Sequence, residues 1–340
     1  MRLKRLLYPV HYLLRMNFRL FNEFAEYSHK ISGESLWKLK LNAWLSIWFY
    51  NVSPLEYFQY NFPVLGKAER KKWAGNGYMH EYQRQMNPLG AREILRNKIV
   101  FHEAYAKLVK HRFYSLKVLK EKPELADFLF KDRAKKWVSK SSTGQCGLGI
   151  EIFNLEEITS WEQLLKRMEK KGNDMLEEFI QQHDDLEALA PGGLNTLRVI
   201  TQINKNAEVD ILGVRLRLNV GNFVDNLAAG NLGTAVDVFS GQLCSNGVYS
   251  DIRKQEESHH PISKKPIKGF EIPFYKESLD LAIKAALLYP ENRSIGWDIA
   301  ITNTGPDIIE GNHDWCKLLW QLPNNIGLKP TLVNYQHHNY

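Results

Sequence analysis

The sequence predicts an α+β fold in which helices come first and antiparallel strands come last. Residues 1–60 have the apolar spacing of helices, with a break at residues 51–54. Between residues 91 and 185 helical and strand-like segments alternate, and from Asn195 most segments are strand-like. Residues 204–207 form a turn signature between two apolar runs, which indicates a hairpin. This order does not fit a doubly wound sheet, because strands and helices do not alternate throughout.

Local patterns predict the individual elements. Apolar spacing predicts a helix within residues 91–111, after Gly90. Further helices are expected at 123–130, 162–170 and 276–289, and strands at 113–119, 135–140, 150–155, 175–180, 195–203, 208–220 and 235–239. Two apolar strands around a turn at 303–305 predict a last hairpin between residues 295 and 312. The tail after Pro323 is polar and loop-like.

Composition is typical of a globular protein. Hydrophobic residues make up 44% of the chain and charged residues 24%. The three cysteines, Cys146, Cys244 and Cys316, lie far apart and form no CxxC pair. This usage fits a reducing cytoplasm and indicates no metal knuckle.

The first 90 residues are basic and rich in aromatic residues. They hold 13 Lys or Arg against 6 Asp or Glu, and 18 of the 40 aromatic residues. They form either a helical cap packed on the body or an extension whose residues 1–60 lie on an anionic membrane, and the two interpretations can coexist. Arg15 and Arg19 interrupt the first apolar run, so no signal peptide is expected, and residues 41–52 are too few to span a bilayer. No nucleic-acid-binding module accompanies the charge, so no nucleic-acid partner is expected.

The last hairpin carries three oxygen-bearing side chains in an apolar stretch. A three-residue loop at 303–305 pairs Asp298 with Glu310, and strand alternation puts Glu310 and Asn312 on one face. Opposed carboxylates repel unless a cation or a shared proton lies between them, and hard oxygen ligands suit Mg²⁺. The hairpin therefore indicates a magnesium site, with a solvent-facing polar side as the alternative.

A glycine-spaced loop follows the strand that ends at Lys140. Gly144, Gly147 and Gly149 let backbone N–H groups turn toward an anion, and the lysine beside them can neutralise phosphate charge. The sequence lacks GxxxxGK[ST], so this is not a Walker loop. A phosphate-binding loop and an ordinary turn both fit the pattern.

Three arginines lie on predicted strands. Arg198 lies on the first strand of the 204–207 hairpin, and Arg215 and Arg217 share one face of the second. An arginine among apolar strand residues needs an anionic partner. The partner is either an anionic ligand or a carboxylate such as Glu208 or Asp210.

In this order the motifs resemble the ATP-grasp superfamily. The order is Lys98 on a helix, Lys140 before a glycine loop, the segment LEEFI, the strand arginines, an Asn–Gly segment and a closing D…EGN. NTLR, VDN and D…EGN look most like the sugar-transfer-associated branch, which accompanies bacterial surface-polysaccharide genes. The resemblance covers roughly residues 98–315 and implies two α+β subdomains that grip ATP between antiparallel sheets, after an N-terminal helical extension. The implied boundaries are 1–90, 91–185 and 186–340.

The resemblance also implies a role for each matching residue. Lys98 and Lys140 would reach the ATP phosphates under a loop that includes Ser141, Gly144 and Gly147. The hinge strand of Glu177, Glu178, Phe179 and Ile180 would bind adenine, and Glu187, with Asp184 and Asp185 as competitors, would bind the ribose. Arg198, Arg217 and Asn226 would contact the γ-phosphate or a substrate carboxylate. Asp298, Glu310 and Asn312 would hold one or two Mg²⁺ ions, or Mn²⁺.

The chemistry that the resemblance implies is ATP-dependent carboxylate–amine ligation through an acyl phosphate. The expected partners are a small or glycan-linked carboxylate and an amine, and the expected place is the cytoplasm, with attachment to the inner membrane face left open. A kinase that phosphorylates a hydroxyl group is the alternative within the fold. A non-catalytic protein that binds a membrane or polyanion is the alternative outside it.

Overall fold

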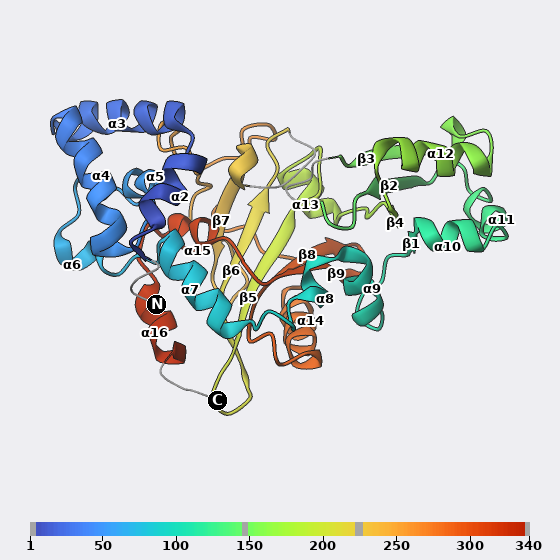
Figure 1. Ribbon diagram of the computed structural model, residues 1–340. Helices are drawn as coiled ribbons and strands as arrows, with labels where there is room; N and C mark the ends of the chain where they lie inside the picture. The colour runs from blue at the N-terminus through green and yellow to red at the C-terminus, as the bar shows by residue number, and fades with distance from the viewer. Residues whose placement is uncertain (1–4, 145–148, 222–226, 337–340) are drawn as a thin grey trace.

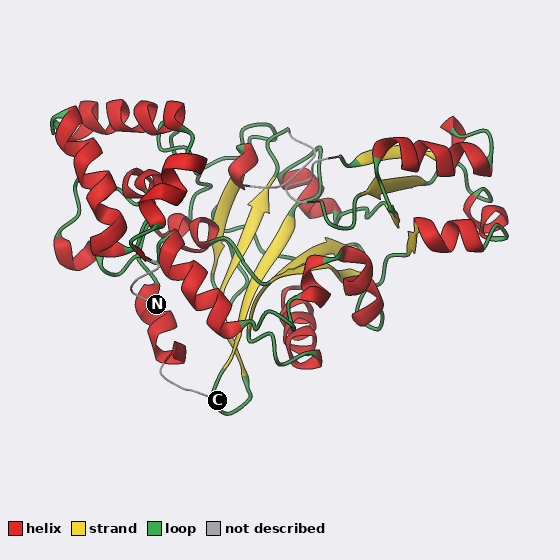
Figure 2. Cartoon of the chain, in the orientation of Figure 1, coloured by secondary structure: helices red, strands yellow, loops and turns green. Residues whose placement is uncertain are grey.

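The computed structural model describes residues 5–144, 149–221 and 227–336, which form three parts in a row (Figures 1 and 2). The N-terminal helices (blue in Figure 1) lie at one end, a five-stranded sheet lies in the middle, and a four-stranded sheet with its own helices lies at the other end. Every strand pair within these two sheets is antiparallel. The predicted α+β class is confirmed.

Helices make up most of the first 90 residues, as predicted. Asn51 has a left-handed backbone (φ 59°), and a Ser53–Glu56 capping box begins the next helix, which explains the break. The helices of this part are α2 (Tyr8–Arg15), α3 (Phe18–Ser32), α4 (Leu36–Tyr50), α5 (Pro54–Gln59), α6 (Lys67–Arg70) and α7 (Asn76–Met86).

These helices enclose an aromatic core of their own. Phe21, Phe24, Tyr57, Phe58 and Trp73 are among its buried members. Leu318 and Leu322, from near the C-terminal end of the described chain, pack against the same core. The extension therefore packs on the body of the protein, as the cap interpretation requires.

The five-stranded sheet is covered on both faces. Leu197 and Val199 of its central strand belong to the same core as Ala282 of α14 (Tyr275–Leu288), whereas Ile200 belongs to a second cluster with residues of α7. All eight residues of that strand are buried as a result. The strands are β5 (Thr196–Ile203), β6 (Val209–Leu218), β7 (Leu232–Val236), β8 (Ser294–Thr302) and β9 (Gly305–Asn312), in the order β7-β6-β5-β8-β9.

The four-stranded sheet has a separate core around Trp137 and Phe153. Leu164 and Met168 of α12 (Trp161–Lys171) are buried in it. The strands are β1 (Phe113–Ser115), β2 (Lys136–Lys140), β3 (Glu151–Asn154) and β4 (Met175–Glu178), in the order β1-β4-β2-β3. Two short helices, α10 (Leu116–Glu121) and α11 (Leu125–Leu129), complete this part.

Several predicted segments differ from the structure. The strand predicted at 113–119 ends at Ser115, because the Ser115 side chain accepts from the N–H of Val118 and caps α10. The strand predicted at 235–239 is β7, which ends at Val236. The single helix within 91–111 is two helices, α8 (Glu93–Arg96) and α9 (Lys98–Ala104), because the side chain of Asn97 caps α9 by accepting from the N–H groups of Ile99 and Val100. The loop-like tail is also wrong. It contains α16 (Lys329–Gln336), whose Leu332 is buried in one cluster with residues of α7, and it follows α15 (Lys317–Gln321).

The domain boundaries 1–90, 91–185 and 186–340 remain a prediction. Phe101 of α9 is buried in the core of the five-stranded sheet, and Ile94 and Leu95 of α8 pack against that core. The first helices of the proposed small subdomain therefore pack on the neighbouring sheet.

Within the described ranges, no helix combines the length and the apolar character needed to cross a membrane.

Glu56 connects the N-terminal helices with α15. Its side chain accepts hydrogen bonds from the N–H groups of Ser53 (2.7 Å) and Asn76 (2.8 Å) and lies 3.1 Å from Lys317 Nζ. Only 3% of the Glu56 side chain and 19% of the Lys317 side chain are exposed.

We expect Glu56→Ala to lower the free energy of unfolding by about 3–5 kcal/mol, because the buried Lys317 ammonium loses its counter-charge. Urea denaturation measures the change. Glu69→Ala is the matched control: its 2.7 Å ion pair with Lys72 is about half exposed, so its loss should cost less than about 1 kcal/mol. Equal losses of stability in the two variants would contradict a stabilising role for the buried Glu56–Lys317 ion pair.

Candidate active site

The β8–β9 hairpin places Asp298 opposite Glu310, as predicted. The predicted three-residue loop is wrong, because Thr302 pairs with Gly305 and the turn between them has two residues. A β-bulge next to Asp298 leaves Ile309 unpaired, since Ile299 pairs with Ile308. The bulge offsets the shorter turn, so the two carboxylates still meet.

Strand register extends this pair into a charged row across the sheet. Arg198 of β5 pairs with Arg215 of β6 on one side and with Asp298 of β8 on the other. Asp298 in turn pairs with Glu310 of β9. Cross-strand partners share a face, so four strands present charged side chains to one side of the sheet.

Two arginines hold the carboxylate of Asp298. Arg198 binds it with two nitrogens, Nε to Oδ1 and Nη2 to Oδ2 (2.9 Å), and Arg217 Nη2 lies 2.7 Å from Oδ2. Burial alone would raise the pKa of Asp298, but the two guanidinium groups lower it to about 2. The carboxylate partner of these arginines is thus Asp298, and not Glu208 or Asp210.

Arg215 has a different environment. Its Nε and Nη2 donate to the carbonyl oxygen of Trp320, the former at 3.1 Å. Burial lowers its pKa to about 10. Arg215 therefore holds the chain near α15 and lies outside the carboxylate cluster.

Glu310 and Asn312 lie next to Asp298, and Lys98 lies next to Glu310. Asn312 Nδ2 is 3.3 Å from both Asp298 Oδ2 and Glu310 Oε1, and Lys98 Nζ is 3.9 Å from Glu310 Oε2. Burial of its carboxyl group and the charge of Asp298 raise the pKa of Glu310. The amide group of Asn312 donates to both carboxylates and so lies in a position that a cation could take. Rotation of the Asn312 side chain about χ2 would turn its amide oxygen toward that position. The donors fit a magnesium site.

Lys98 also contacts the glycine loop. Its Nζ donates to the carbonyl oxygen of Gly144 (2.6 Å), and its backbone N–H donates to Ser142 (2.9 Å). Lys98 therefore links the loop after β2 to the hairpin of the other sheet. Ser141 lies in the described part of this loop, with its hydroxyl 3.4 Å from that of Thr143.

Lys140 and the hinge strand form a second cluster. Lys140 Nζ is 2.5 Å from Glu177 Oε2, whereas Glu178 pairs with Lys135 and accepts from the N–H of Arg112. Strand β4 ends at Glu178, so Phe179 and Ile180 follow it as half-buried residues instead of extending it to residue 180. The structure thus brings the two predicted lysines to different carboxylates, Glu310 and Glu177.

Glu187 lies on α13 (Asp184–Leu189), and its hydrogen bonds are not with Asp298, Glu310 or Asn312. It accepts from the side chain of Gln182 and from the N–H of Gly192 (3.2 Å). Its ribose-binding role stays a prediction. Two other predicted site residues, Gly147 and Asn226, lie outside the described residues.

Sequence reasoning missed three residues near Glu177. His102, His111 and Asp307 are buried beside it, and His111 Nδ1 lies 2.8 Å from Asp307 Oδ2. The two histidines are nine positions apart, and the carboxylates come from distant strands. No spacing in the sequence groups them, and only the fold does.

A model of the sugar-transfer associated ATP-grasp family matches residues 78–337. The chain belongs to this family. The match begins before Lys98 and includes most of α7, which packs on the five-stranded sheet. The predicted family is confirmed, and with it the ATP-grasp fold.

Solved structures resemble the chain only distantly. A biotin carboxylase from Campylobacter jejuni is 10% identical with a TM-score of 0.48, over 81% of this chain and 54% of that one. A D-alanine–D-alanine ligase from Helicobacter pylori is 14% identical with a TM-score of 0.43, over 74% of this chain and 63% of that one. The chain spans about half the length of the biotin carboxylases that it matches. No curated protein sequence matches it.

We expect Asp298→Asn to destabilise the protein by about 3–5 kcal/mol at pH 7, because Arg198 and Arg217 lose their buried counter-charge. The folded-state pKa of Asp298, about 2, is below its ordinary value near 3.9. Its stabilisation is therefore complete above about pH 5 and is lost as the pH falls toward 2.

Guanidinium denaturation at pH 2, 3, 4, 5 and 7 measures this dependence. The decrease in the free energy of unfolding between pH 7 and pH 2 should be about 2 kcal/mol smaller in Asp298→Asn than in the wild type. Asp280→Asn removes an exposed carboxylate of α14 and should keep the wild-type profile. A profile of Asp298→Asn that parallels the wild type would show that the ion pairs contribute nothing.

Proposed function

We propose that this protein is an ADP-forming carboxylate–amine ligase that acts on a sugar acid or amino acid in bacterial surface-polysaccharide biosynthesis. The observation that carries the proposal is the charged row Arg198–Asp298–Glu310, completed by Asn312 and by Lys98 from outside the sheet. It combines anion-binding and cation-binding groups on one face, as the transfer of a phosphoryl group to a carboxylate requires. The sugar-transfer association of the family supports a glycan-linked substrate.

Glu310, Asn312 and Asp298 are the residues that would hold Mg²⁺, or Mn²⁺. Asp298 is already bound by Arg198 and Arg217, so Glu310 and the amide oxygen of Asn312 are the more available donors. When bound, the metal ion neutralises charge on the phosphates.

The cations of the site serve to bind and orient anions. Lys98 lies between the glycine loop and Glu310, so its ammonium group can bind a phosphate placed between them. Arg198 and Arg217 present guanidinium groups at the same carboxylate and can orient a substrate carboxylate beside it. No general base is needed for the first step.

The proposed reaction has two steps. A substrate carboxylate oxygen attacks the γ-phosphorus of ATP, the bond from that phosphorus to the β–γ bridging oxygen breaks, and ADP leaves. The amine nitrogen then attacks the acyl carbon of the acyl phosphate, the carbon–oxygen bond to the phosphate breaks, and amide, phosphate and a proton are released.

The direct test incubates the full chain with ATP, Mg²⁺ and paired panels of uronic or amino acids and amines. ADP and phosphate release are measured, and products are identified by mass spectrometry. An amide with one ADP and one phosphate per turnover supports the ligase. A phosphorylated hydroxyl compound without free phosphate supports the kinase instead, and absence of both nucleotide binding and ADP release overturns the proposal.

We expect Glu310→Gln to lower kcat/KM by about 100-fold or more, because one anionic metal ligand is lost. In the wild type the pKa of Glu310 is raised, so activity should fall as the pH is lowered through that pKa. Excess Mg²⁺ should move the fall to lower pH, because the metal ion competes with the proton.

Glu291→Gln, a change at an exposed carboxylate before β8, is the control and should keep the wild-type activity and profile. A pH profile insensitive to Mg²⁺ would argue against Glu310 as a metal ligand.

We also propose that the N-terminal helices attach the enzyme to an anionic membrane surface on the cytoplasmic side. Trp37, Leu41 and Trp48 of α4 are 69%, 48% and 47% exposed, and their spacing of four and seven residues places them on one helix face. Lys38 and Lys40 lie on the same helix, and the first 90 residues are basic. Exposed aromatic residues beside lysines fit the interface of an anionic bilayer.

We expect Trp37→Ser with Trp48→Ser to weaken binding to phosphatidylserine-containing vesicles by at least about tenfold, because each such side chain contributes about 1.5–3 kcal/mol when buried. Vesicle co-sedimentation measures binding. Phe239→Ser is the control, since Phe239 is 94% exposed and lies after β7. Unchanged co-sedimentation of the double variant would rule out the α4 surface.

A further inference from the structure

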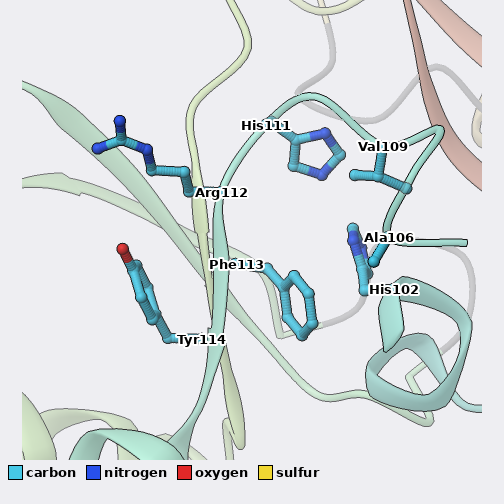
Figure 3. A pocket seen from close by; sticks show the side chains of 7 residues that line it. All are labelled: His102, Ala106, Val109, His111, Arg112, Phe113 and Tyr114. Atoms are coloured by element: carbon cyan, nitrogen blue, oxygen red, sulfur yellow. The ribbon is translucent and has the colours of Figure 1, made fainter. Parts of the chain in front are cut away.

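Three side chains from separate elements converge beside the hinge strand. His102 comes from α9, His111 from the loop before β1, and Glu177 from β4. Their side chains are 0%, 4% and 7% exposed, and one ligand atom from each lies within 4.8 Å of the others. Figure 3 shows His102, His111 and Phe113 on one side of the chain and Arg112 and Tyr114 on the other.

The converging atoms lack hydrogen-bond partners. His102 Nε2 is 2.8 Å and His111 Nε2 is 3.9 Å from Glu177 Oε1. None of these three buried atoms has a partner in hydrogen-bond geometry. Each buried polar atom without a partner costs about 1–3 kcal/mol, so an occupant that all three atoms can bind would stabilise this site.

Both imidazole rings are held in place. His111 Nδ1 lies 2.8 Å from Asp307 Oδ2, and Asp307 also accepts the backbone N–H groups of Lys110 and His111. With Nδ1–H donating to Asp307, the Nε2 lone pair of His111 faces Glu177. A carboxylate behind a histidine is the usual support of a metal-binding imidazole. The ring of His102 packs against Phe113, with centroids 4.5 Å apart.

The charges around the site favour a cation. Glu177 and Asp307 supply two carboxylates, and Lys140 Nζ, 2.5 Å from Glu177 Oε2, offsets one of them. Lys140 uses Oε2, which leaves Oε1 directed at the two histidines. With neutral imidazoles, one negative charge remains without a counter-charge within this group of residues.

We propose that His102 Nε2, His111 Nε2 and Glu177 Oε1 bind one divalent transition-metal ion of the zinc class. Two imidazoles and a carboxylate are a donor set of zinc sites that leave a fourth position open. Bonds of about 2.0–2.1 Å in a tetrahedron separate ligand atoms by roughly 3.4 Å, so small side-chain rotations would lengthen the 2.8 Å distance and shorten the 3.9 Å distance. A cavity of about 280 Å³ is lined in part by His102 and His111 and adjoins the proposed site (Figure 3).

This site is separate from the one formed by Asp298, Glu310 and Asn312, and it does not depend on the proposed ligase reaction. The ion would join α9, the loop before β1, and β4. Through Asp307 of β9 it would also connect the small sheet to the large one. By fixing Glu177, it would position Lys140.

The test uses the full chain, stripped with a chelator and titrated with Zn²⁺ and, separately, with Co²⁺, in excess Mg²⁺ and without ATP. Elemental analysis after dialysis should find one zinc per chain, and Co²⁺ should show the absorption of a tetrahedral nitrogen–oxygen site. His102→Gln and His111→Gln should each weaken binding by at least about 100-fold, and Asp307→Asn by about 10–100-fold. His259→Ala, a change at an exposed histidine, should have no effect.

Circular dichroism confirms that the variants are folded, and the Co²⁺ spectrum of the wild type needs no variant. The proposal is overturned if the wild type binds no more zinc than His102→Gln and gives no tetrahedral Co²⁺ spectrum. A proton shared among these side chains would then supply the missing charge. Because no nucleotide is present, this outcome is distinct from failure of the ligase proposal.

Discussion

The buried carboxylate of Asp298 and the two arginines that bind it organise the centre of this protein. Arg198 and Arg217 come from adjacent strands, and Asp298 comes from the strand on the other side of β5. None of the three charges is stable in the core without the others. The same ion pairs set the positions of Glu310 and Asn312, because these lie opposite or beside Asp298 on the hairpin.

The site depends on both sheets and on the segment between them. Lys98 begins α9, which packs on the large sheet, yet its side chain contacts the glycine loop of the small one. Glu177 and Asp307 make a second connection through His111. The N-terminal helices add a third connection, through Glu56 and Lys317. A family match that begins at residue 78 agrees with this packing, because α7 covers one face of the large sheet.

Much of the secondary structure can be predicted from the sequence, because the patterns that specify it are local. The strands around residues 204–207, the strand that ends at Lys140 and the helix near residues 276–289 follow from apolar periodicity and turn residues. The break at Asn51 follows from capping chemistry. The incorrect predictions also have local causes. The helix predicted within 91–111 is interrupted because Asn97 caps α9. The residues after Pro323 are mostly polar, so their composition does not predict the helix that buries Leu332. In the β8–β9 hairpin, the predicted turn is one residue longer than the observed turn, and the sequence does not predict the bulge at Ile309. The two differences cancel, so Glu310 still lies opposite Asp298.

The sequence by itself determined the fold class, the order of the motifs and, through that order, the family, because each rests on spacing along the chain. It also indicated that Asp298, Glu310 and Asn312 act together, because they share one hairpin. Only the tertiary structure decided that Arg198 and Arg217 bind Asp298, and that Lys140 binds Glu177. It alone grouped His102, His111 and Asp307 around that glutamate. These contacts join residues 37 to 196 positions apart. Such pairings are set by packing and burial, which local periodicity does not encode.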